Sequence, residues 1–456
     1  MIETIHFYHT NDLHSHFQHW PRIHELVTAR KKWHVEEGES SFTIDLGDHI
    51  DRSHIFTEGT LGKGNVNLLN EALYDVATIG NNEGITLSYD ELENLYEDAQ
   101  FKVVVGNLFN QNGEVPNWLL PTTVLTTMHG TKIGVTALTA EYTQFYEQLG
   151  WQVTDAFVAL KAHVEQLKGE TDVIICMSHL GIQADEEMAE QIPEIDVIFG
   201  AHTHHILHEG KLVNRSLLAA AGKFGYYVGH VTLEYDLEKK EVIKKHALLY
   251  DTNELQESVD EEGFLNNLVN VGKNLLSVPA FYQKEHLPKE WFKDSALSTY
   301  FGNALTTFCN TECALFNAGL FLTDLHRGEI SHFDIHQMMP HPINPCVIEL
   351  TGEQLKDIYN LSLNESWPNL EIKGLGFRGV VMGKMITHQF KVVEDDLFIR
   401  GRLIEPTVKV RLATLDMFTF GYFFPAFKEL PKTYFMPEFI RDILIAYGQK
   451  NEYRNN

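Results

Sequence analysis

Five short motifs in the first half of the chain carry side chains that commonly bind metal ions. In chain order they supply Asp12 and His14, then Asp48 and Asp51, then Asn81 with Asn82, then His179, and finally His202 with His204. A carboxylate and an imidazole two residues apart on extended backbone point the same way, so Asp12 and His14 can share one ion. Asp48 follows a glycine that permits a sharp turn, and its two oxygens can bridge two cations. The motifs therefore predict metal-assisted chemistry.

Each motif follows a stretch whose apolar pattern predicts a buried strand. The predicted strands are 2–9, 41–46, 75–79, 102–105, 132–138, 172–177 and 195–199. The helical apolar spacings between them cover 22–34, 64–74, 89–99, 156–168 and 184–191. Such alternation predicts an α/β fold, in which ligands bind beyond the carboxyl ends of the strands. We therefore expect the five motifs to converge on one site.

The same motifs, in this order, resemble the calcineurin-like metallophosphoesterase superfamily, whose pattern is DxH, GDxxD, GNHE, a lone histidine and GHxH. The flanking segments 9–16 and 220–231 are similar to its 5'-nucleotidase family. The later segments 317–319, 328–330 and 347–355 resemble the C-terminal domain of that family. The resemblance covers nearly the whole chain and is more specific in the first half.

This resemblance implies an α/β architecture with two domains. The first is a metallophosphoesterase sandwich of two mixed β-sheets flanked by helices, and the second is a smaller α/β 5'-nucleotidase-like domain. We expect the catalytic domain over 1–250, a connecting helix and hinge over 251–280, and the substrate-binding domain over 281–456. Residues 251–280 begin with an acidic stretch and continue with apolar residues at helical spacing. Beyond them the pattern predicts helices near 295–309, 352–363 and 437–448, and strands near 312–317, 345–350 and 389–394.

The resemblance also implies which residues bind the two divalent ions. It assigns Asp12, His14, Asp48 and His204 to the first ion, and Asp48, Asn81, His179 and His202 to the second. Asp48 then bridges the pair. Nitrogen and oxygen ligands without thiolate suit Mn, Zn, Fe, Co or Mg, and the sequence does not choose among them. Such a pair polarises the phosphoryl oxygens and lowers the pKa of a bridging water, which attacks phosphorus as hydroxide.

One position departs from the family's pattern at the predicted catalytic centre. Where GNHE has its catalytic histidine, this chain has Asn82. An amide can donate a hydrogen bond to a phosphoryl group but cannot transfer a proton at useful pH. We expect Asp48 and Asn82 to act in catalysis, and we expect substrates whose leaving group departs without protonation, such as phosphoanhydrides or activated esters.

The second domain departs from the family as well. The run Asn317-Ala318-Gly319-Leu320-Phe321 stands where the family often has NGGGIR, so the substrate-gripping arginine is absent. We predict that Asn317, Gly319 and Arg378 contact the substrate. The family stacks nucleobases between aromatic rings, and Phe377 and Phe420 are the candidates for that role here.

Composition excludes several other kinds of protein. A formal net charge of −27 argues against a nucleic-acid polymer as partner, because phosphate backbones need a basic surface. No apolar run is long enough to cross a membrane, and no signal peptide is visible, which favours the cytoplasm. The 4 cysteines form no CxxC pair and are expected to be reduced and buried. Nothing in the sequence indicates an obligate protein partner.

Three functions remain open on the sequence alone. The first is hydrolysis of phosphoesters, with nucleotides as substrates, as part of nucleotide catabolism. The second is a phosphodiesterase or nucleotide pyrophosphohydrolase, which the substitution at Asn82 makes plausible. The third is a metal-loaded nucleotide-binding sensor with weak turnover. The sequence contains no GxSxG motif, which argues against a serine hydrolase. It also contains no GxxxxGK[ST] motif, which argues against a P-loop protein.

Overall fold

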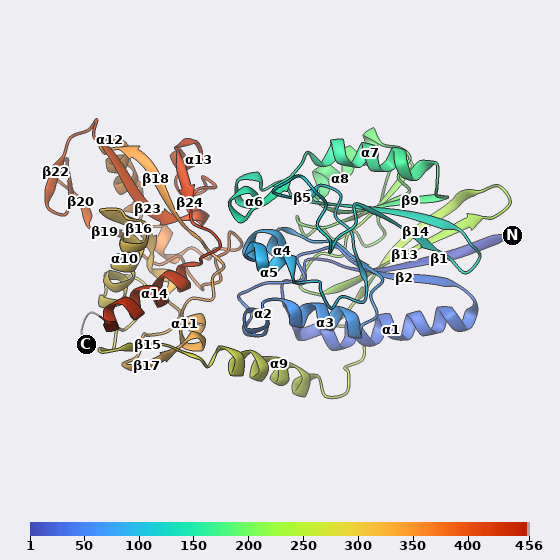
Figure 1. Cartoon of the computed structure of the whole chain (residues 1–456), viewed down its shortest axis with the longest axis horizontal. Helices are drawn as coiled ribbons and strands as arrows, with labels where there is room; N and C mark the ends of the chain where they lie inside the picture. Colours follow the sequence, from blue (N-terminus) through green and yellow to red (C-terminus); the bar gives the residue numbers. More distant parts are fainter. Residues whose placement is uncertain (454–456) are drawn as a thin grey trace. The chain divides into compact units, whose positions relative to one another are not determined.

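The computed structural model describes residues 1–453, and the chain divides into two compact units. Unit 1 is Met1–Gly272 and unit 2 is Lys273–Asn456. The division falls within helix α9 (Glu261–Leu276), which is the helix expected between 251 and 280 (Figure 1). The boundary of unit 1 therefore lies later in the chain than the expected end of the catalytic domain at 250.

Unit 1 contains two mixed six-stranded sheets, as the resemblance implied. The first has the order β14-β13-β1-β2-β3-β4. Its strands are β1 (Ile2–Thr10), β2 (Ser40–Asp45), β3 (Val76–Ala77), β4 (Lys102–Val103), β13 (Tyr227–Asp236) and β14 (Glu241–Asp251). β1 to β4 run parallel, whereas β13 is antiparallel to β1. The parallel arrangement places the ends of β1, β2 and β3 at one edge.

The second sheet has the order β11-β12-β10-β9-β7-β6. Its strands are β6 (Thr122–Thr126), β7 (Lys132–Thr139), β9 (Val173–His179), β10 (Val197–Gly200), β11 (Lys211–Val213) and β12 (Ser216–Ala219). β7, β9, β10 and β12 are parallel, and the outer strands β6 and β11 are antiparallel to their neighbours. β9 and β10 therefore end at a common edge of this sheet too.

The two sheets enclose the main hydrophobic core of unit 1. β1 contributes Ile5 and Phe7, and the facing strands contribute Ile175, Met177 and Phe199, all 0% exposed. On the outer faces, α1 (Trp20–Glu37) and α3 (Lys63–Glu71) lie on the side of the first sheet, and α7 (Ala156–Lys168) and α8 (Ile182–Gln191) lie on the side of the second. A second cluster of buried apolar residues lies beneath α7 and α8.

Several short elements of unit 1 were not predicted from the pattern. They are α2 (Ile55–Thr60), α4 (Asn81–Thr86), α6 (Thr143–Leu149), β5 (Leu108–Asn110) and β8 (Trp151–Val153). The helix expected over 89–99 is shorter, α5 (Tyr89–Glu93). These segments span too few turns or residues for an apolar period to emerge. α4 matters for the site because it begins at Asn81, after the short loop 78–80 that follows β3.

Unit 2 is a smaller α/β unit around a five-stranded sheet of order β19-β16-β23-β18-β24. Its strands are β16 (Cys313–Asn317), β18 (Pro345–Thr351), β19 (Met385–His388), β23 (Lys409–Leu415) and β24 (Lys432–Tyr434). The helices α10 (Ala296–Phe308), α12 (Gly352–Ser362) and α14 (Ile440–Tyr453) correspond to expected helices. The strand expected near 389–394 is β20 (Phe390–Val393), which belongs to a separate three-stranded sheet with β21 (Asp396–Ile399) and β22 (Arg402–Ile404).

Two expectations about the whole chain can be compared with these units. All 4 cysteines are buried and free of disulfides, as expected for reduced thiols. Among residues 1–453, no helix has both the length and the apolar character that membrane crossing requires.

Candidate metal centre

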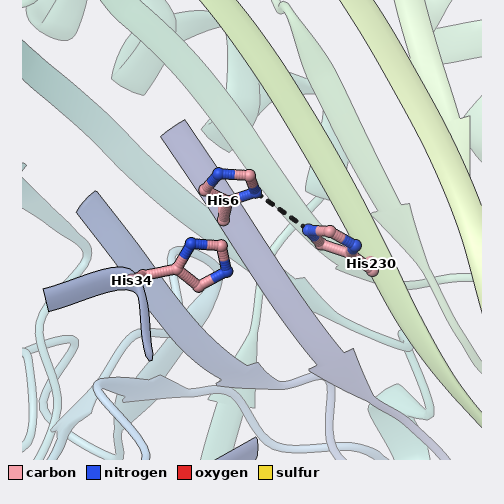
Figure 2. Close-up of side chains that lie close together, drawn as sticks. All are labelled: His6, His34 and His230. Carbon is pink, nitrogen blue, oxygen red and sulfur yellow. Dashed lines mark hydrogen bonds between the residues drawn. The ribbon is translucent and has the colours of Figure 1, made fainter. Parts of the chain in front are cut away.

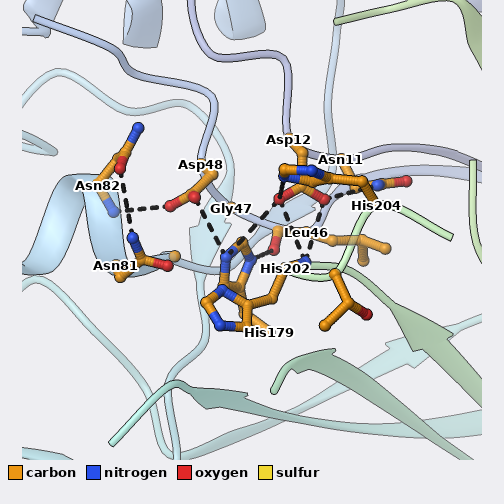
Figure 3. A network of polar contacts seen from close by, with 12 residues as sticks. Asn11, Asp12, Leu46, Gly47, Asp48, Asn81, Asn82, His179, His202 and His204 are labelled. Atoms are coloured by element: carbon orange, nitrogen blue, oxygen red, sulfur yellow. Dashed lines mark hydrogen bonds and ion pairs between the residues drawn. The ribbon is translucent and has the colours of Figure 1, made fainter. Parts of the chain in front are cut away.

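The five motifs meet at the carboxyl ends of strands in unit 1 (Figure 3). β1, β2 and β3 lead into the loops of Asp12, Asp48 and Asn81, while β9 ends at His179 and β10 leads into His202. Backbone hydrogen bonds tie the first two loops together, from Asp12 N to the Gly47 carbonyl oxygen at 3.0 Å and from His14 N to the Asp48 carbonyl oxygen at 2.8 Å. The side chains are thus brought together by the sheet edges, as the alternating pattern predicted.

Two carboxylates lie at the centre of this group. Oδ2 of Asp48 is 3.4 Å from Nε2 of His179 and 3.7 Å from Nε2 of His14. Oδ1 of Asp12 is 3.4 Å from Nε2 of His204 and 3.9 Å from Nε2 of His179. The carboxylates therefore lie among imidazoles from both halves of the sandwich.

Two further residues complete the predicted set. The ring of His202 lies beside that of His179, with centroids 5.3 Å apart, and its backbone N donates to both oxygens of Asp12. Asn81 follows Gly80, whose backbone lies so near Asp48 and the His179 ring that an added Cβ would collide with both. All seven predicted ligands are therefore in one neighbourhood.

Unpartnered buried atoms show that this group fits cations. Nδ1 of His179 donates to the carbonyl oxygen of Leu46 at 2.7 Å, so its Nε2 is left as the aprotic nitrogen when the ring is neutral. That Nε2 and Oδ1 of Asn81 are buried without a hydrogen-bond partner. An unpaired buried acceptor is costly, and a divalent ion satisfies it. The donor set of imidazole, carboxylate and amide oxygen suits the divalent metals named above.

The electrostatics of the group point the same way. Burial lowers the pKa of the His179 imidazole, but the carboxylates of Asp48 and Asp12 overcome this effect and raise the pKa to about 10. Burial lowers the pKa of His202 to about 4, so this imidazole is neutral and its lone pair is available. The negative charge of the two buried carboxylates therefore stabilises positive charge between them, and bound cations would supply that charge.

The backbone of the site is held in an unusual conformation. Asp12, His14, Asp48, His202 and His204 all have positive φ, between 48° and 70°. Left-handed backbone at a residue other than glycine costs about 1 kcal/mol or more and persists only where the surroundings enforce it, typically at functional sites. These turns aim successive side chains inward at the ends of the strands.

Gly80 meets a different constraint, which is space. A Cβ on Gly80 would collide with Oδ1 of Asp48 and with the ring of His179. The close approach of the loop after β3 to the loop after β2 therefore requires glycine here, which explains the glycine before Asn81 in the motif.

Asn82 occupies the position of the family's catalytic histidine. Its backbone N donates to Oδ1 of Asp48 at 2.7 Å. Its side-chain Nδ2 donates to the Ile50 carbonyl oxygen at 3.0 Å and lies 2.8 Å from Nδ1 of His14. The residue is nearly buried, and its amide is already engaged with the walls of the site.

Sequence reasoning gave no role to two residues that organise the centre. Asn11 donates to Oδ2 of Asp12 at 2.8 Å and to the Gly222 carbonyl oxygen at 2.6 Å. Glu83 is buried and accepts from the backbone N of Asp48, Ile50 and Gly80. Burial and the neighbouring Asp48 carboxylate raise the pKa of Glu83 to about 7. In the sequence, only the position of Asn11 beside Asp12 and the position of Glu83 within the Asn81 motif could have indicated these roles.

The predicted substrate residues all lie in unit 2. Nδ2 of Asn317 and the backbone N of Gly319 both donate to the Met382 carbonyl oxygen, at 2.8 and 2.9 Å. Arg378 donates from its backbone N to Nδ1 of His341. The structure thus places Asn317 and Gly319 in contact with one loop, 381–383.

The two predicted aromatic residues differ in accessibility. Phe377 is 2% exposed and stacks on His341, with centroids 5.1 Å apart and planes at 4°, so its ring belongs to the interior of unit 2. Phe420 is 44% exposed. Of the two, Phe420 is the ring that is accessible to solvent.

Comparison with known proteins places this architecture in a family. The calcineurin-like phosphoesterase family matches residues 5–205, and the 5'-nucleotidase C-terminal domain matches residues 276–372. The metallophosphoesterase YunD of Bacillus subtilis is 41% identical over 97% of this chain and 99% of its own length. The chain belongs to the calcineurin-like metallophosphoesterases. It is a hydrolase whose family uses divalent metal ions, and it carries a 5'-nucleotidase C-terminal domain.

More distant relatives of this metallophosphoesterase align along most of its length. An apyrase of Tabanus yao is 24% identical and covers 90% of this chain and 80% of its own. The NAD nucleotidase of Haemophilus influenzae has a TM-score of 0.66 at 12% identity, covering 99% and 97% of the two chains. A 5'-nucleotidase precursor of Thermus thermophilus has a TM-score of 0.59 at 17% identity, covering 98% and 97%. The two structures show that the fold is shared.

Proposed function

We propose that this metallophosphoesterase hydrolyses nucleotide phosphoesters at a pair of divalent ions. The proposed ligands are Asp12, His14, Asp48, Asn81, His179, His202 and His204. The observation that carries the proposal is the position of Asp48, whose Oδ2 lies between His14 and His179 at 3.7 and 3.4 Å. A carboxylate that bridges two ions needs a further ligand for each ion close by, and His14 and His179 are the two candidates beside Asp48. Bound ions would polarise the phosphoryl oxygens and supply a water of lowered pKa.

The chain's own residues fix the geometry of this reaction. Asp48 is held by the backbone N of Asn82 on Oδ1, which leaves Oδ2 facing the imidazoles. The Glu83 carboxylate holds the loop of Asp48 in place by accepting a hydrogen bond from the backbone N of Asp48. Asn11 holds Asp12 against the loop at Gly222. In the hydrolysis, water adds to phosphorus and the P–O bond to the leaving group breaks, so the rigid ligands define the direction of attack.

A nucleotide substrate is supported by the second unit. The 5'-nucleotidase C-terminal domain and the names of the relatives point to nucleotides as the substrate class. Phe420 offers an exposed ring for a nucleobase, and stacking of this kind contributes about 1–3 kcal/mol per base. Asn317, Gly319 and Arg378 remain the predicted contacts for the remainder of the nucleotide. A role in nucleotide catabolism follows from such a substrate.

A second candidate function is cleavage of phosphoanhydrides or diesters. It is favoured by Asn82, because an amide that already donates to Ile50 provides no proton for a leaving alcohol. A phosphate leaving group needs no such proton. This candidate uses the same metal centre and differs only in which bond to phosphorus breaks.

One experiment distinguishes these functions from a sensor with weak turnover. Metal-free protein is supplied in turn with Mn, Zn, Co and Mg, and the products from AMP, ADP, NAD and p-nitrophenyl phosphate are identified. Phosphate release from AMP supports the nucleotidase, whereas release only from ADP, or cleavage of NAD to mononucleotides, supports the second candidate. Nucleotide binding without turnover under all four metals would leave only the sensor and would refute the hydrolysis of nucleotides.

The cellular location and partners stay predictions. Free buried cysteines are compatible with the cytoplasm, which the sequence favoured. A small phosphorylated molecule is the one partner that the proposed chemistry requires.

A further inference from the structure

Three imidazoles form a second cluster in unit 1, on the opposite face of β1 from the hydrophobic core. His6 lies on β1, His34 near the end of α1, and His230 on β13 (Figure 2). His6 precedes the last residue of β1, Thr10, by four positions, which separates it from the end of the strand by about 13 Å. This imidazole cluster is therefore distinct from the metal centre.

The cluster is compact enough to hold one ion. One ring nitrogen from each histidine lies within 4.8 Å of the other two. Nδ1 of His6 is 3.0 Å from Nε2 of His230, and Oγ1 of Thr232 is 3.4 Å from both. Two imidazole nitrogens on a tetrahedral zinc ion, each about 2.0–2.1 Å from the metal, stand about 3.3 Å apart. The 3.0 Å between the nitrogens of His6 and His230 is close to that value.

Glu39 controls the outer nitrogens of two of the rings. Its Oε2 is 3.1 Å from Nε2 of His6 and 3.0 Å from Nδ1 of His34, and a carboxylate can only accept from them. The proton of each neutral ring is thus drawn to the Glu39 side, and Nδ1 of His6 and Nε2 of His34 stay aprotic. Nε2 of His34 lies 3.0 Å from the hydroxyl of Tyr8, a hydrogen bond that the ion replaces when this nitrogen binds it. Metal-binding histidines commonly donate their second N–H to a carboxylate in this way.

Burial keeps these imidazoles neutral. It lowers the pKa of His6 to about 4 and of His230 to about 3, and it lowers the pKa of His34 as well. His34 is 1% exposed and His6 is 7% exposed. Nδ1 of His230 is buried with no hydrogen-bond partner. Neutral, desolvated imidazoles are the form that binds metal, since no charged ring has to be deprotonated first.

We propose that His6, His34 and His230 bind a third divalent ion of the zinc class, with Thr232 beside them and Glu39 as the outer carboxylate. Nε2 of His230 becomes a ligand when the proton of this neutral ring moves to Nδ1, which is buried without a hydrogen-bond partner, so the ring binds the ion without losing a proton. The rings of His6 and His34 stack with centroids 3.8 Å apart, so their planes rotate apart on binding. The site has a structural role, because it fastens the end of α1 to β1 and β13.

Metal content tests this proposal without reference to activity. The full chain is stripped with a chelator, dialysed against excess Zn²⁺ and analysed for zinc per chain. We expect one zinc more in the wild type than in His34→Gln, in which an amide of similar length replaces the imidazole. The matched control is His24→Gln, on the same helix and away from the cluster, and it should retain the wild-type content. Equal zinc in the wild type and His34→Gln would overturn the proposal.

Two further measurements keep the test independent of folding and of the metal centre. Glu39→Gln leaves all three imidazoles in place and should weaken the extra zinc by about 10–100-fold in affinity, as loss of an outer carboxylate does. A crystal grown with Zn²⁺ should show an anomalous peak beside His6, and absence of a peak there would refute the site. Loss of zinc at Asp48 with zinc retained beside His6 would contradict the proposed catalytic pair and leave this inference standing.

Discussion

Nδ1 of His179, at the end of β9, donates a 2.7 Å hydrogen bond to the carbonyl oxygen of Leu46, which directly follows β2. This bond joins the two sheets of unit 1 at the edge where the ligands gather. It turns the unpartnered Nε2 toward Asp48. The orientation of one ligand is therefore fixed by a segment more than a hundred residues earlier in the chain.

Replacing His179 with alanine should remove one of the two ions of the proposed catalytic pair. The buried carboxylates of Asp12 and Asp48 would lose an imidazole that both of them contact. We expect kcat/KM to fall by at least about 100-fold, the scale seen when a preorganised electrostatic group is removed. Metal analysis and kinetics on the same sample would measure both effects. His205→Ala, an exposed neighbour of the His204 ligand, is the control and should change neither quantity.

Gly80→Ala should damage the site although no ligand is changed. The added Cβ collides with Asp48 and His179, so the loops after β2 and β3 must separate. We expect weaker metal binding and at least about a tenfold loss of kcat/KM. Gly169→Ala is the matched control, because a Cβ there meets nothing within 4 Å. Unchanged metal affinity in Gly80→Ala would show that the close approach is not required.

Asn82→His should restore a proton donor for alcohol leaving groups. We expect turnover of AMP to rise at least about tenfold, at the low end of what a general acid contributes. Turnover of p-nitrophenyl phosphate should stay within about twofold, since its leaving group needs no proton. Asn82→Gln, which keeps an amide, should give no gain on AMP. AMP turnover that does not change in Asn82→His, with both ions retained, would contradict the role assigned to Asn82.

His341 should make the stability of unit 2 fall in acid. Its Nε2 donates to the Leu320 carbonyl oxygen and its Nδ1 accepts from Arg378 N, so a proton on Nδ1 would face a donor. Burial lowers the pKa of His341 from 6.5 to about 3. The unfolded chain therefore binds this proton first, and stability present above pH 6.5 is lost as the pH falls toward 3, by as much as about 5 kcal/mol.

Urea unfolding at several pH values would measure this effect. We expect the transition midpoint of the wild type to move to lower urea between pH 7.5 and pH 5. His341→Gln, which cannot titrate, should show a smaller shift over the same range while being less stable at pH 7.5. Parallel pH dependence in both proteins would exclude His341 as the cause.

Much of unit 1 could be predicted because its signals are local. The strand before Asp12 alternates apolar and polar residues, the strand before His179 has a continuous apolar run, and each is followed by a short polar loop. The short helix α4 was missed because it has fewer residues than two helical turns. In unit 2, β20 was expected but its sheet was not, because strand pairing depends on distant segments.

The sequence by itself determined the family and the set of ligand types, because a motif of a few residues encodes both the side chains and the turn that carries them. The tertiary structure decided which neighbours hold these side chains in place. Leu46 orients His179, Asn11 reaches Gly222, and His341 covers Phe377. It also brought His6, His34 and His230 together from separate elements. A buried polar atom must find its partner in space, and that partner is often far away in the chain.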